Sequence, residues 1–210
     1  MTPSPELIDI SRPLAGDTAC WPGDVPFAFR LGWTIAGGAS VNVGSISTSI
    51  HTATHCDAPF HYDDAGKTME LLPLEVFVGP AWVVDVRGSS RWQDRLAHVD
   101  FSEAPRVLFH TGGWPETTRF PETIPIMEPA LPDWLADRGV RLIGVDLPSV
   151  DPLDSKLLDV HHALGRRGIV IVEGLWLNEV PEGRYGLIAL PLKIVGADGS
   201  PLRAALHLLS

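Results

Sequence analysis

The sequence predicts a mixed α/β fold in which a β-sheet dominates. Runs rich in β-branched and aromatic residues outnumber the helical patterns. Two of these runs, Leu142–Asp146 and Ile169–Val172, enclose a helical pattern and indicate a β-α-β unit. The 20 glycines and 19 prolines are scattered along the chain, as expected where many short elements are joined by tight turns. We therefore expect one domain that spans residues 1–210.

The expected strands are short and follow one another along the whole chain. In order they are Leu7–Ile10, Val25–Ile35, Val41–Ile50, Ala81–Val86, Val107–His110, Leu142–Asp146, Ile169–Val172, Leu187–Val195 and Leu202–Leu209. Pro191 interrupts the penultimate run, which should therefore bend there or lie at a sheet edge.

Two segments predict helices. The first, Glu128–Gly139, has apolar side chains at helical spacing and a glycine that suits its C-terminal end. The second, Ser155–Gly165, places four side chains on one face: Leu157, Leu158, His161 and Leu164.

Composition and charge exclude several classes of protein. The formal net charge of −10 argues against a nucleic-acid partner, because phosphate binding needs clustered Lys and Arg. No run of eighteen or more apolar residues exists, so we expect no membrane-spanning helix. The start, Met1–Glu6, lacks the basic and apolar regions of a signal peptide. Cys20 and Cys56 are too few for a disulfide framework, and we expect a cytoplasmic protein.

The densest group of metal-ligand side chains is the segment His51-Thr-Ala-Thr-His55-Cys-Asp57-Ala-Pro-Phe-His61. His51 and His55 are four residues apart, so they face the same way on a helical turn or on an extended strand. Asp57 and His61 keep the same even spacing. Imidazole nitrogen and carboxylate oxygen are donors that zinc prefers. Single histidines are usually structural, but three histidines and an aspartate in one short segment favour a metal site, since the chain has only 8 histidines.

Two later residues could add ligands to this site. His161 lies on the apolar face of the second expected helix, and Glu173 ends an apolar strand. A carboxylate at the end of a buried strand is costly unless it is paired or bound to a metal. Each residue also has a structural alternative, because His161 could be a core histidine and Glu173 could pair with Arg166 or Arg167.

The eleven-residue segment resembles the HxGTHxDxPxH signature of the cyclase-like metal-dependent hydrolases, which include bacterial kynurenine formamidases. Four other parts resemble blocks of this family: Ile8–Pro13, Cys20–Asp24, Gly144–Pro152, and His161 with Glu173-Gly-Leu. The similarity runs from about residue 7 to residue 196, which is nearly the whole chain. It implies a swivelling β/β/α fold and a homodimer or larger oligomer.

The resemblance also implies a ligand set for two zinc ions per subunit. His51, His55 and Asp57 would hold the first ion. Asp57 would bridge to the second ion, which His161 and Glu173 would hold.

Other residues of the segment take different roles under the resemblance. His61 would donate and accept protons, and Trp21 would line the substrate pocket. Ala53 stands where the family usually has glycine, a difference that matters only if the backbone there needs a positive φ. Cys56 has the opposite strand parity to His55 and Asp57, which favours a packing role over metal binding.

The implied activity is zinc-dependent hydrolysis of a small molecule, N-formyl-L-kynurenine, to L-kynurenine and formate. Another amide hydrolase of the same family, such as an isatin hydrolase, shares these motifs and remains an alternative. A non-catalytic metal-binding protein is a second alternative, although His61 would then lack a role. A serine hydrolase is disfavoured, because the chain has no G-x-S-x-G motif.

Overall fold

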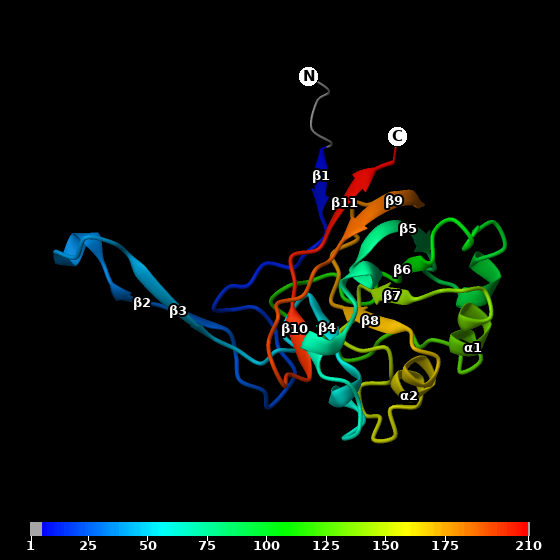
Figure 1. Cartoon of the computed structure of the whole chain (residues 1–210), viewed down its shortest axis with the longest axis horizontal. Helices are drawn as coiled ribbons and strands as arrows, with labels where there is room; N and C mark the ends of the chain where they lie inside the picture. Colours follow the sequence, from blue (N-terminus) through cyan, green and yellow to red (C-terminus); the bar gives the residue numbers. More distant parts are fainter. Residues whose placement is uncertain (1–5, 210) are drawn as a thin grey trace.

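A computed structural model describes residues 6–209, and most of them belong to one body built on a nine-stranded sheet (Figure 1). The strands are β1 (Leu7–Asp9), β2 (Ala28–Trp33), β3 (Val43–Ser47), β4 (His55–Asp57), β5 (Val78–Asp85), β6 (Arg106–His110), β7 (Leu142–Val145), β8 (Val170–Glu173), β9 (Gly183–Ile188), β10 (Gly199–Pro201) and β11 (Ala205–Leu208). The helices are α1 (Leu131–Ala136) and α2 (Asp159–Arg166). Residues 1–5 and 210 lie outside the described residues. The first of these belong to the start of the sequence, where we found no signal-peptide pattern.

The large sheet has the order β1-β11-β9-β5-β6-β7-β8-β4-β10. Its centre, β5 to β8, is parallel, and the strands on both sides pair antiparallel. Helices α1 and α2 lie on one face of this centre (Figure 1). The expected α/β class with a predominantly β core, including the β-α-β unit β7-α2-β8, is confirmed.

Apolar side chains bury both faces of the sheet. On the helical face, Leu135 of α1 and Leu164 of α2 pack in one cluster with Ile143 and Ile171 of the sheet. On the other face, Phe77, Leu187 and Leu206 form a second cluster, which also contains Cys56. Neighbouring residues of a strand point to opposite faces of the sheet, so His55 and Asp57 point away from the cluster that holds Cys56.

Some strands predicted from the sequence differ from those in the structure. The expected strand Leu187–Val195 is wrong over most of its length, because β9 ends at Ile188 and Pro191 forms only an isolated bridge to Leu202. Strand β9 begins instead at Gly183, and its glycines weakened the strand pattern. At one of them, Gly186, a Cβ would lie 2.1 Å from His207 Nε2, so a larger residue would displace that side chain. The three-residue strands β4 and β10 were not expected as strands.

The helices are shorter than the sequence suggested. Helix α1 covers only the middle of Glu128–Gly139, and Gly139 follows it with φ of +79°. Helix α2 begins at Asp159 because Leu158 has a left-handed backbone with φ of +48°. Leu157 therefore lies before the helix and is 72% exposed, so the expected apolar face is wrong at its start.

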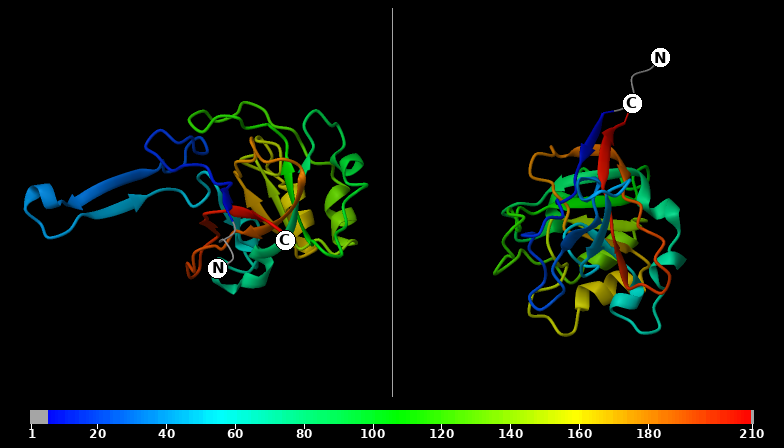
Figure 2. Two further views of the ribbon diagram at one scale, coloured as in Figure 1. Left: turned by 90° about the horizontal axis from the view of Figure 1, so that it is seen from above. Right: turned by 90° about the vertical axis from the view of Figure 1, so that its left-hand side faces the viewer.

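Strands β2 and β3 form a separate two-stranded ribbon that extends away from the body (Figures 1 and 2). Among the described residues, no helix is long and apolar enough to cross a membrane.

Candidate metal centre

Strands β4 and β8 bring the ligand side chains together. They pair antiparallel, with His55 opposite Glu173 and Asp57 opposite Ile171. Directly paired residues project from the same face of a sheet, so His55, Asp57 and Glu173 share one face. All three residues are at least 97% buried. Two short strands thus supply an imidazole and two carboxylates at one point.

Asp57 lies at the centre of the group. Its Oδ1 is 3.0 Å from His51 Nδ1 and 3.4 Å from His55 Nε2. Its Oδ2 faces the other way, at 3.5 Å from His161 Nε2. The two oxygens therefore face different sets of imidazoles, as a bridging carboxylate would.

Glu173, at the end of β8, lies beside both His55 and His161. Its Oε2 is 3.5 Å from His55 Nε2, and its Oε1 is 3.5 Å from His161 Nε2. The same Oε1 accepts a hydrogen bond from the backbone N–H of Val150 at 2.9 Å, which fixes the carboxylate. The alternative pairing of Glu173 with Arg166 or Arg167 is not what the structure shows.

The start of α2 positions His161. Asp151 accepts hydrogen bonds from the backbone N–H groups of Val160 and His161, which satisfies donors at the helix N-terminus. Asp151 Oδ2 is also 2.7 Å from His161 Nδ1. An imidazole that donates through Nδ1 to a carboxylate presents Nε2 as a lone-pair donor, the usual arrangement around a metal ligand. Asp151 thus fixes both the helix and the orientation of the ring.

His51, His61 and Asp198 form the more accessible edge of the group. The rings of His51 and His61 lie 3.9 Å apart. Asp198 Oδ2 is 3.0 Å from His51 Nε2 and 3.7 Å from His61 Nδ1. His51 and His61 retain side-chain exposures of 16% and 31%, so a small molecule can approach the group from this edge.

Two atoms of the group indicate that it is built for a cation. His55 Nε2 and Asp57 Oδ2 are buried and have no hydrogen-bond partner among the described residues. Leaving a buried polar group unpaired costs about 1–3 kcal/mol. His55 Nδ1 donates to the carbonyl of Ala53 at 3.0 Å, which leaves the buried Nε2 as a lone-pair donor. A divalent ion bound by imidazole nitrogen and carboxylate oxygen would satisfy both atoms.

Distances group the residues differently from the ligand set expected from the sequence. Two sets of donor atoms lie within 4.8 Å of one another: His51, Asp57 and His61, and His55, Asp57 and Glu173. Asp57 belongs to both sets, as expected for the bridge. His61 lies with His51, although we expected it to act in proton transfer, and His55 lies with Glu173.

Electrostatics distinguish His61 from the buried histidines. Burial lowers the pKa of His55, but the carboxylates of Asp57 and Glu173, at 3.4 and 3.5 Å from its Nε2, outweigh burial and raise that pKa to about 10 while no cation is bound. Burial lowers the pKa of His61, and the opposing carboxylates do not restore it. His61 is therefore neutral near pH 7 and able to accept a proton.

Two positions with positive φ, Ala53 within the segment 51–57 and Gly174 after β8, shape the backbone of this segment. Ala53 has φ of 60°, in the left-handed region that costs a non-glycine residue roughly 1–2 kcal/mol. The glycine that the family usually has there would avoid this cost. Gly174 packs against the same peptide, because a Cβ on Gly174 would lie 2.0 Å from the carbonyl oxygen of Ala53. Thr54 ties the two strands together by donating to the Gly174 carbonyl at 2.6 Å.

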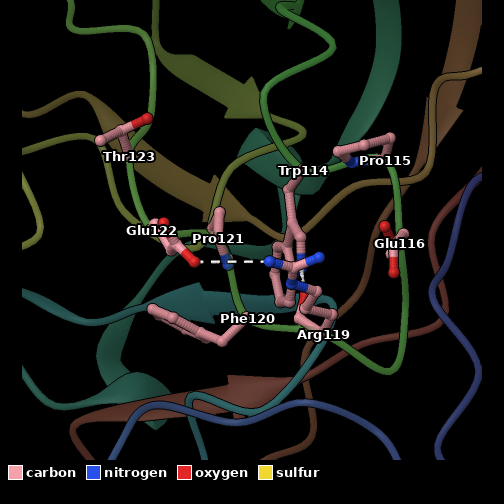
Figure 3. A pocket seen from close by; sticks show the side chains of 8 residues that line it. All are labelled: Trp114, Pro115, Glu116, Arg119, Phe120, Pro121, Glu122 and Thr123. Atoms are coloured by element: carbon pink, nitrogen blue, oxygen red, sulfur yellow. Dashed lines mark hydrogen bonds and ion pairs between the residues drawn. The ribbon is translucent and has the colours of Figure 1, made fainter.

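Trp21 contacts an aromatic loop and none of the imidazoles described above. Its ring packs edge-on against Phe120 at 5.3 Å, and Phe120 lies 5.8 Å from Trp114. Figure 3 shows this loop, which borders a hollow of about 180 Å³. The structure thus brings six of the seven expected site residues into one group and places Trp21 in an aromatic cluster of its own.

A buried arginine links that loop to the metal-ligand segment. Arg12 donates from its side chain to the carbonyls of Trp114 at 2.5 Å and Glu116 at 2.9 Å, and its guanidinium lies 3.8 Å above the Trp114 ring. The backbone N–H of Arg12 donates to Thr54 Oγ1 at 2.8 Å. Arg12 therefore connects the loop to Thr54, the residue before His55, through hydrogen bonds.

Sequence reasoning missed three residues of this arrangement: Arg12, Asp151 and Asp198. Arg12 and Asp151 lie within blocks that carry the family resemblance, which was a usable signal. Asp198 lies in no such block, and only the pairing of β10 with β4 brings it beside His51.

Comparisons with known proteins agree with these features. The family model described as "Putative cyclase" matches residues 8–152. A kynurenine formamidase of Geobacillus thermodenitrificans is 52% identical over 201 residues, which cover 95% of this chain and 96% of that protein. A solved structure of a potential metal-dependent hydrolase with cyclase activity superimposes with a TM-score of 0.82 at 31% identity, covering 99% of this chain and all of that one.

A further solved structure shares this fold. Isatin hydrolase A from Labrenzia aggregata has a TM-score of 0.76 and 24% identity, covering 98% of this chain and 94% of that one. At this identity the likeness concerns the fold.

Proposed function

The chain belongs to the cyclase family of metal-dependent hydrolases, and on that premise we propose that it hydrolyses N-formyl-L-kynurenine to L-kynurenine and formate. The observation that carries the proposal is the buried carboxylate of Asp57 between two sets of imidazoles, with unpaired donor atoms directed into the group. The formamidase relative, which is 52% identical over 95% of the chain, supports the choice of substrate.

We propose zinc as the metal, with two ions per chain. The donors are imidazole nitrogens and carboxylate oxygens, which suit zinc. Asp57 would bridge the ions, with His51 and His55 on its Oδ1 side and His161 on its Oδ2 side. Glu173 approaches both His55 and His161 and would complete the second set.

The reaction needs activated water, a stabilised oxyanion and a proton for the leaving nitrogen. Bound divalent metal ions lower the pKa of water and polarise a carbonyl group. His61 lies at the accessible edge with a lowered pKa, so its neutral ring would take the proton from water and pass it to the aniline nitrogen. The C–N bond of the formamide breaks as the water oxygen bonds to the formyl carbon, which gives the arylamine and formate.

Two carboxylates, of Asp151 and Asp198, would orient the imidazole rings for metal binding and proton transfer. Asp151 holds His161 through Nδ1, so Nε2 faces Asp57. Asp198 lies beside both His51 and His61, and its pKa is lowered to about 2 chiefly by the hydrogen bond with His51. Asp198 is therefore an anion near pH 7 and would stabilise His61 while that ring carries the transferred proton.

Hydrolysis of a cyclic amide such as isatin is the second candidate, favoured by the shared fold with isatin hydrolase A. Assays of the purified protein on N-formyl-L-kynurenine and on isatin separate the two. We expect a higher kcat/KM for N-formyl-L-kynurenine, and the reverse preference would overturn the substrate while leaving the family intact.

We further propose that residues 1–210 form one hydrolase domain, and that the protein is a cytoplasmic homodimer. The nine-stranded sheet, which pairs β1 near the start with β11 near the end, supports one domain. The formal net charge of −10 is consistent with a small-molecule enzyme that has no nucleic-acid partner.

A further inference from the structure

A hollow beside α2 adjoins the metal-ligand group. Its lining includes Asp57 at the end of β4 and Gly165 in the last turn of α2. Its volume is about 370 Å³, within the range of roughly 300–1,000 Å³ that is usual for small-molecule sites. Much of the wall is apolar and comes from five side chains: Leu72, Pro73, Val76, Ile169 and Val170. The hollow therefore has the size and the wall of a site for a small organic molecule.

Two basic side chains, those of Lys67 and Arg141, line the same hollow. Their backbone groups are bonded, since the Lys67 carbonyl accepts from Phe60 and the Arg141 carbonyl accepts from Val170. Their side chains form no ion pair or hydrogen bond with any other residue from 6 to 209. An anion between them would offset the repulsion of two cations that line one hollow.

The charge around the hollow is mainly positive. Arg106 donates from its guanidinium to the carbonyl of Val76, which lines the hollow. Burial lowers the pKa of Arg106, and the charge of Arg141 lowers it further. Asp57 is the one acid in the lining, and its two oxygens face imidazoles of the metal-ligand group. A hollow lined mostly by one sign of charge concentrates ions of the opposite sign, so this one favours an anion.

Tyr62 adds a flat wall and a hydrogen-bond donor. Its ring lies 5.4 Å from the ring of His161, so the wall of the hollow reaches the metal-ligand group. Burial raises the pKa of Tyr62, so its hydroxyl keeps the proton and can donate. A Cβ on Gly165 would lie 2.7 Å from that hydroxyl, so a larger residue there would displace the ring from α2. An aromatic ring offers a face or an edge for packing against a second ring.

We propose that the hollow beside α2 binds a small organic carboxylate with a flat apolar body. The carboxylate would lie between Lys67 and Arg141, where a guanidinium can donate two parallel hydrogen bonds to it. The body would lie on the ring of Tyr62 and against Val76 and Val170. The site goes beyond the proposed reaction and does not depend on it.

Calorimetric titration of the metal-loaded protein with benzoate tests the site. Benzoate combines a carboxylate with a flat ring, and we expect one molecule to bind per chain with a Kd of about 1 mM or lower. Acetate lacks the ring and benzyl alcohol lacks the charge. Each should therefore bind at least about tenfold more weakly than benzoate.

Lys67→Gln and Arg141→Gln test the two cations. Each should raise the benzoate Kd at least about tenfold, the effect of losing a hydrogen bond between charged groups. Arg166→Gln is the matched control, because Arg166 belongs to α2, is exposed and lies outside the lining. It removes the same charge from the chain and should keep the wild-type Kd. Circular dichroism checks the fold of each variant.

A carboxylate could also bind a metal ion directly, and His51→Ala separates the two sites. His51 lies outside the lining of the hollow, and this variant should lose metal. It should still bind benzoate with a Kd close to that of the wild type. The binding result is therefore independent of the proposed metal centre and its reaction.

Two sources share this chemistry: the carboxylate of N-formyl-L-kynurenine itself and a separate small molecule. If the carboxylate of the substrate lies in the hollow, Lys67→Gln and Arg141→Gln should raise its KM about as much as the benzoate Kd, with kcat retained. If a separate molecule occupies the hollow, only the benzoate Kd should rise.

Four results would overturn the inference. The first is no saturable binding of benzoate up to about ten times the expected Kd. The second is a wild-type Kd in the folded Lys67→Gln and Arg141→Gln variants. The third is acetate that binds as tightly as benzoate, which would show only a general attraction of anions to exposed cations. The fourth is loss of benzoate binding in folded His51→Ala, which would assign the binding to the metal ions.

Discussion

The metal-ligand group and the ribbon β2–β3 both depart from the usual rule that polar side chains are exposed and apolar ones buried, but in opposite directions. The first buries His55, Asp57, His161 and Glu173 almost completely. The second exposes aromatic and aliphatic side chains on both faces, with a single charge among them. Charged groups are rarely buried unless paired, and large apolar patches are rarely exposed on a monomer.

The comparison teaches that each region points to the chemistry of what would satisfy it. Buried imidazoles and carboxylates with unpaired donor atoms match a divalent cation. Exposed apolar strands with a single charge among them mark an interaction surface. The physical reason is the same in both regions, since groups that the chain alone leaves unsatisfied are satisfied by a partner of matching chemistry.

The strongest test of the polar region is Asp57→Ala. This change removes the carboxylate shared by both sets of donors. Metal content and turnover should both fall, with a rate loss beyond the ~10²–10⁴-fold expected for a proton-transfer residue. Elemental mass spectrometry and the formamidase assay measure the two effects. Asp64→Ala, an exposed neighbour, should retain both.

The same variant also separates the two regions. Asp57→Ala should leave the ribbon folded, because Asp57 lies outside β2 and β3. Full activity of Asp57→Ala would contradict the bridging role.

His61→Ala tests whether the accessible histidine moves protons or holds metal. Its lowered pKa favours proton transfer, which predicts a rate loss of ~10²–10⁴-fold with the metal retained. His51→Ala should instead lose metal. The distances that place His61 near His51 and Asp57 allow the opposite outcome, in which His61→Ala loses metal as His51→Ala does. That result would make His61 a ligand.

Trp21→Ala should have a smaller effect that is limited to aromatic substrates. Trp21 stacks edge-on with Phe120 in the loop that Arg12 ties to the ligand segment. Aromatic pairs add roughly 0.5–1.5 kcal/mol beyond area burial, so KM for N-formyl-L-kynurenine should rise about tenfold once lost area is included. KM for a small formamide without a ring should change little. Equal effects on both substrates would make Trp21 a packing residue.

Ala53→Gly tests the strained backbone of the ligand segment and should have the smallest effect. Glycine removes the cost of φ at 60°, so the free energy of unfolding should rise by about 0.4–1 kcal/mol. Ala58→Gly is the matched control, because Ala58 is also buried but has φ of −90°, and its free energy of unfolding should fall. Chemical denaturation measures both. A destabilised Ala53→Gly variant would show that the strain has been misjudged.

The sequence predicted the chemistry of the centre better than its geometry. The segment 51–61 concentrates ligands within one short stretch, so local spacing was sufficient to identify them. Asp198 could not be found in this way, because it reaches His51 only through the pairing of β10 with β4. Strands of three residues carry too little pattern to be recognised from sequence.

The fold was predictable where apolar runs are long and uninterrupted, as in β6, β7 and β8. It was misjudged around β9, where the sheet uses a glycine-rich segment and ends at Ile188, before the apolar run that follows. That run looked like a strand because its leucines are apolar, but the structure exposes Leu190 and Leu192. Sequence alone does not distinguish apolar side chains that face the core from those that stay exposed at the surface.

The most direct test of the central claim is a zinc titration of metal-free protein, followed by the rate of N-formyl-L-kynurenine hydrolysis. Chelation should abolish activity, and added zinc should restore it until two ions are bound per chain, the number that the donor set around Asp57 suggests. Asp57→Ala should not recover at any zinc concentration tested. Activity that survives chelation, with no transition metal left in the protein, would contradict the account.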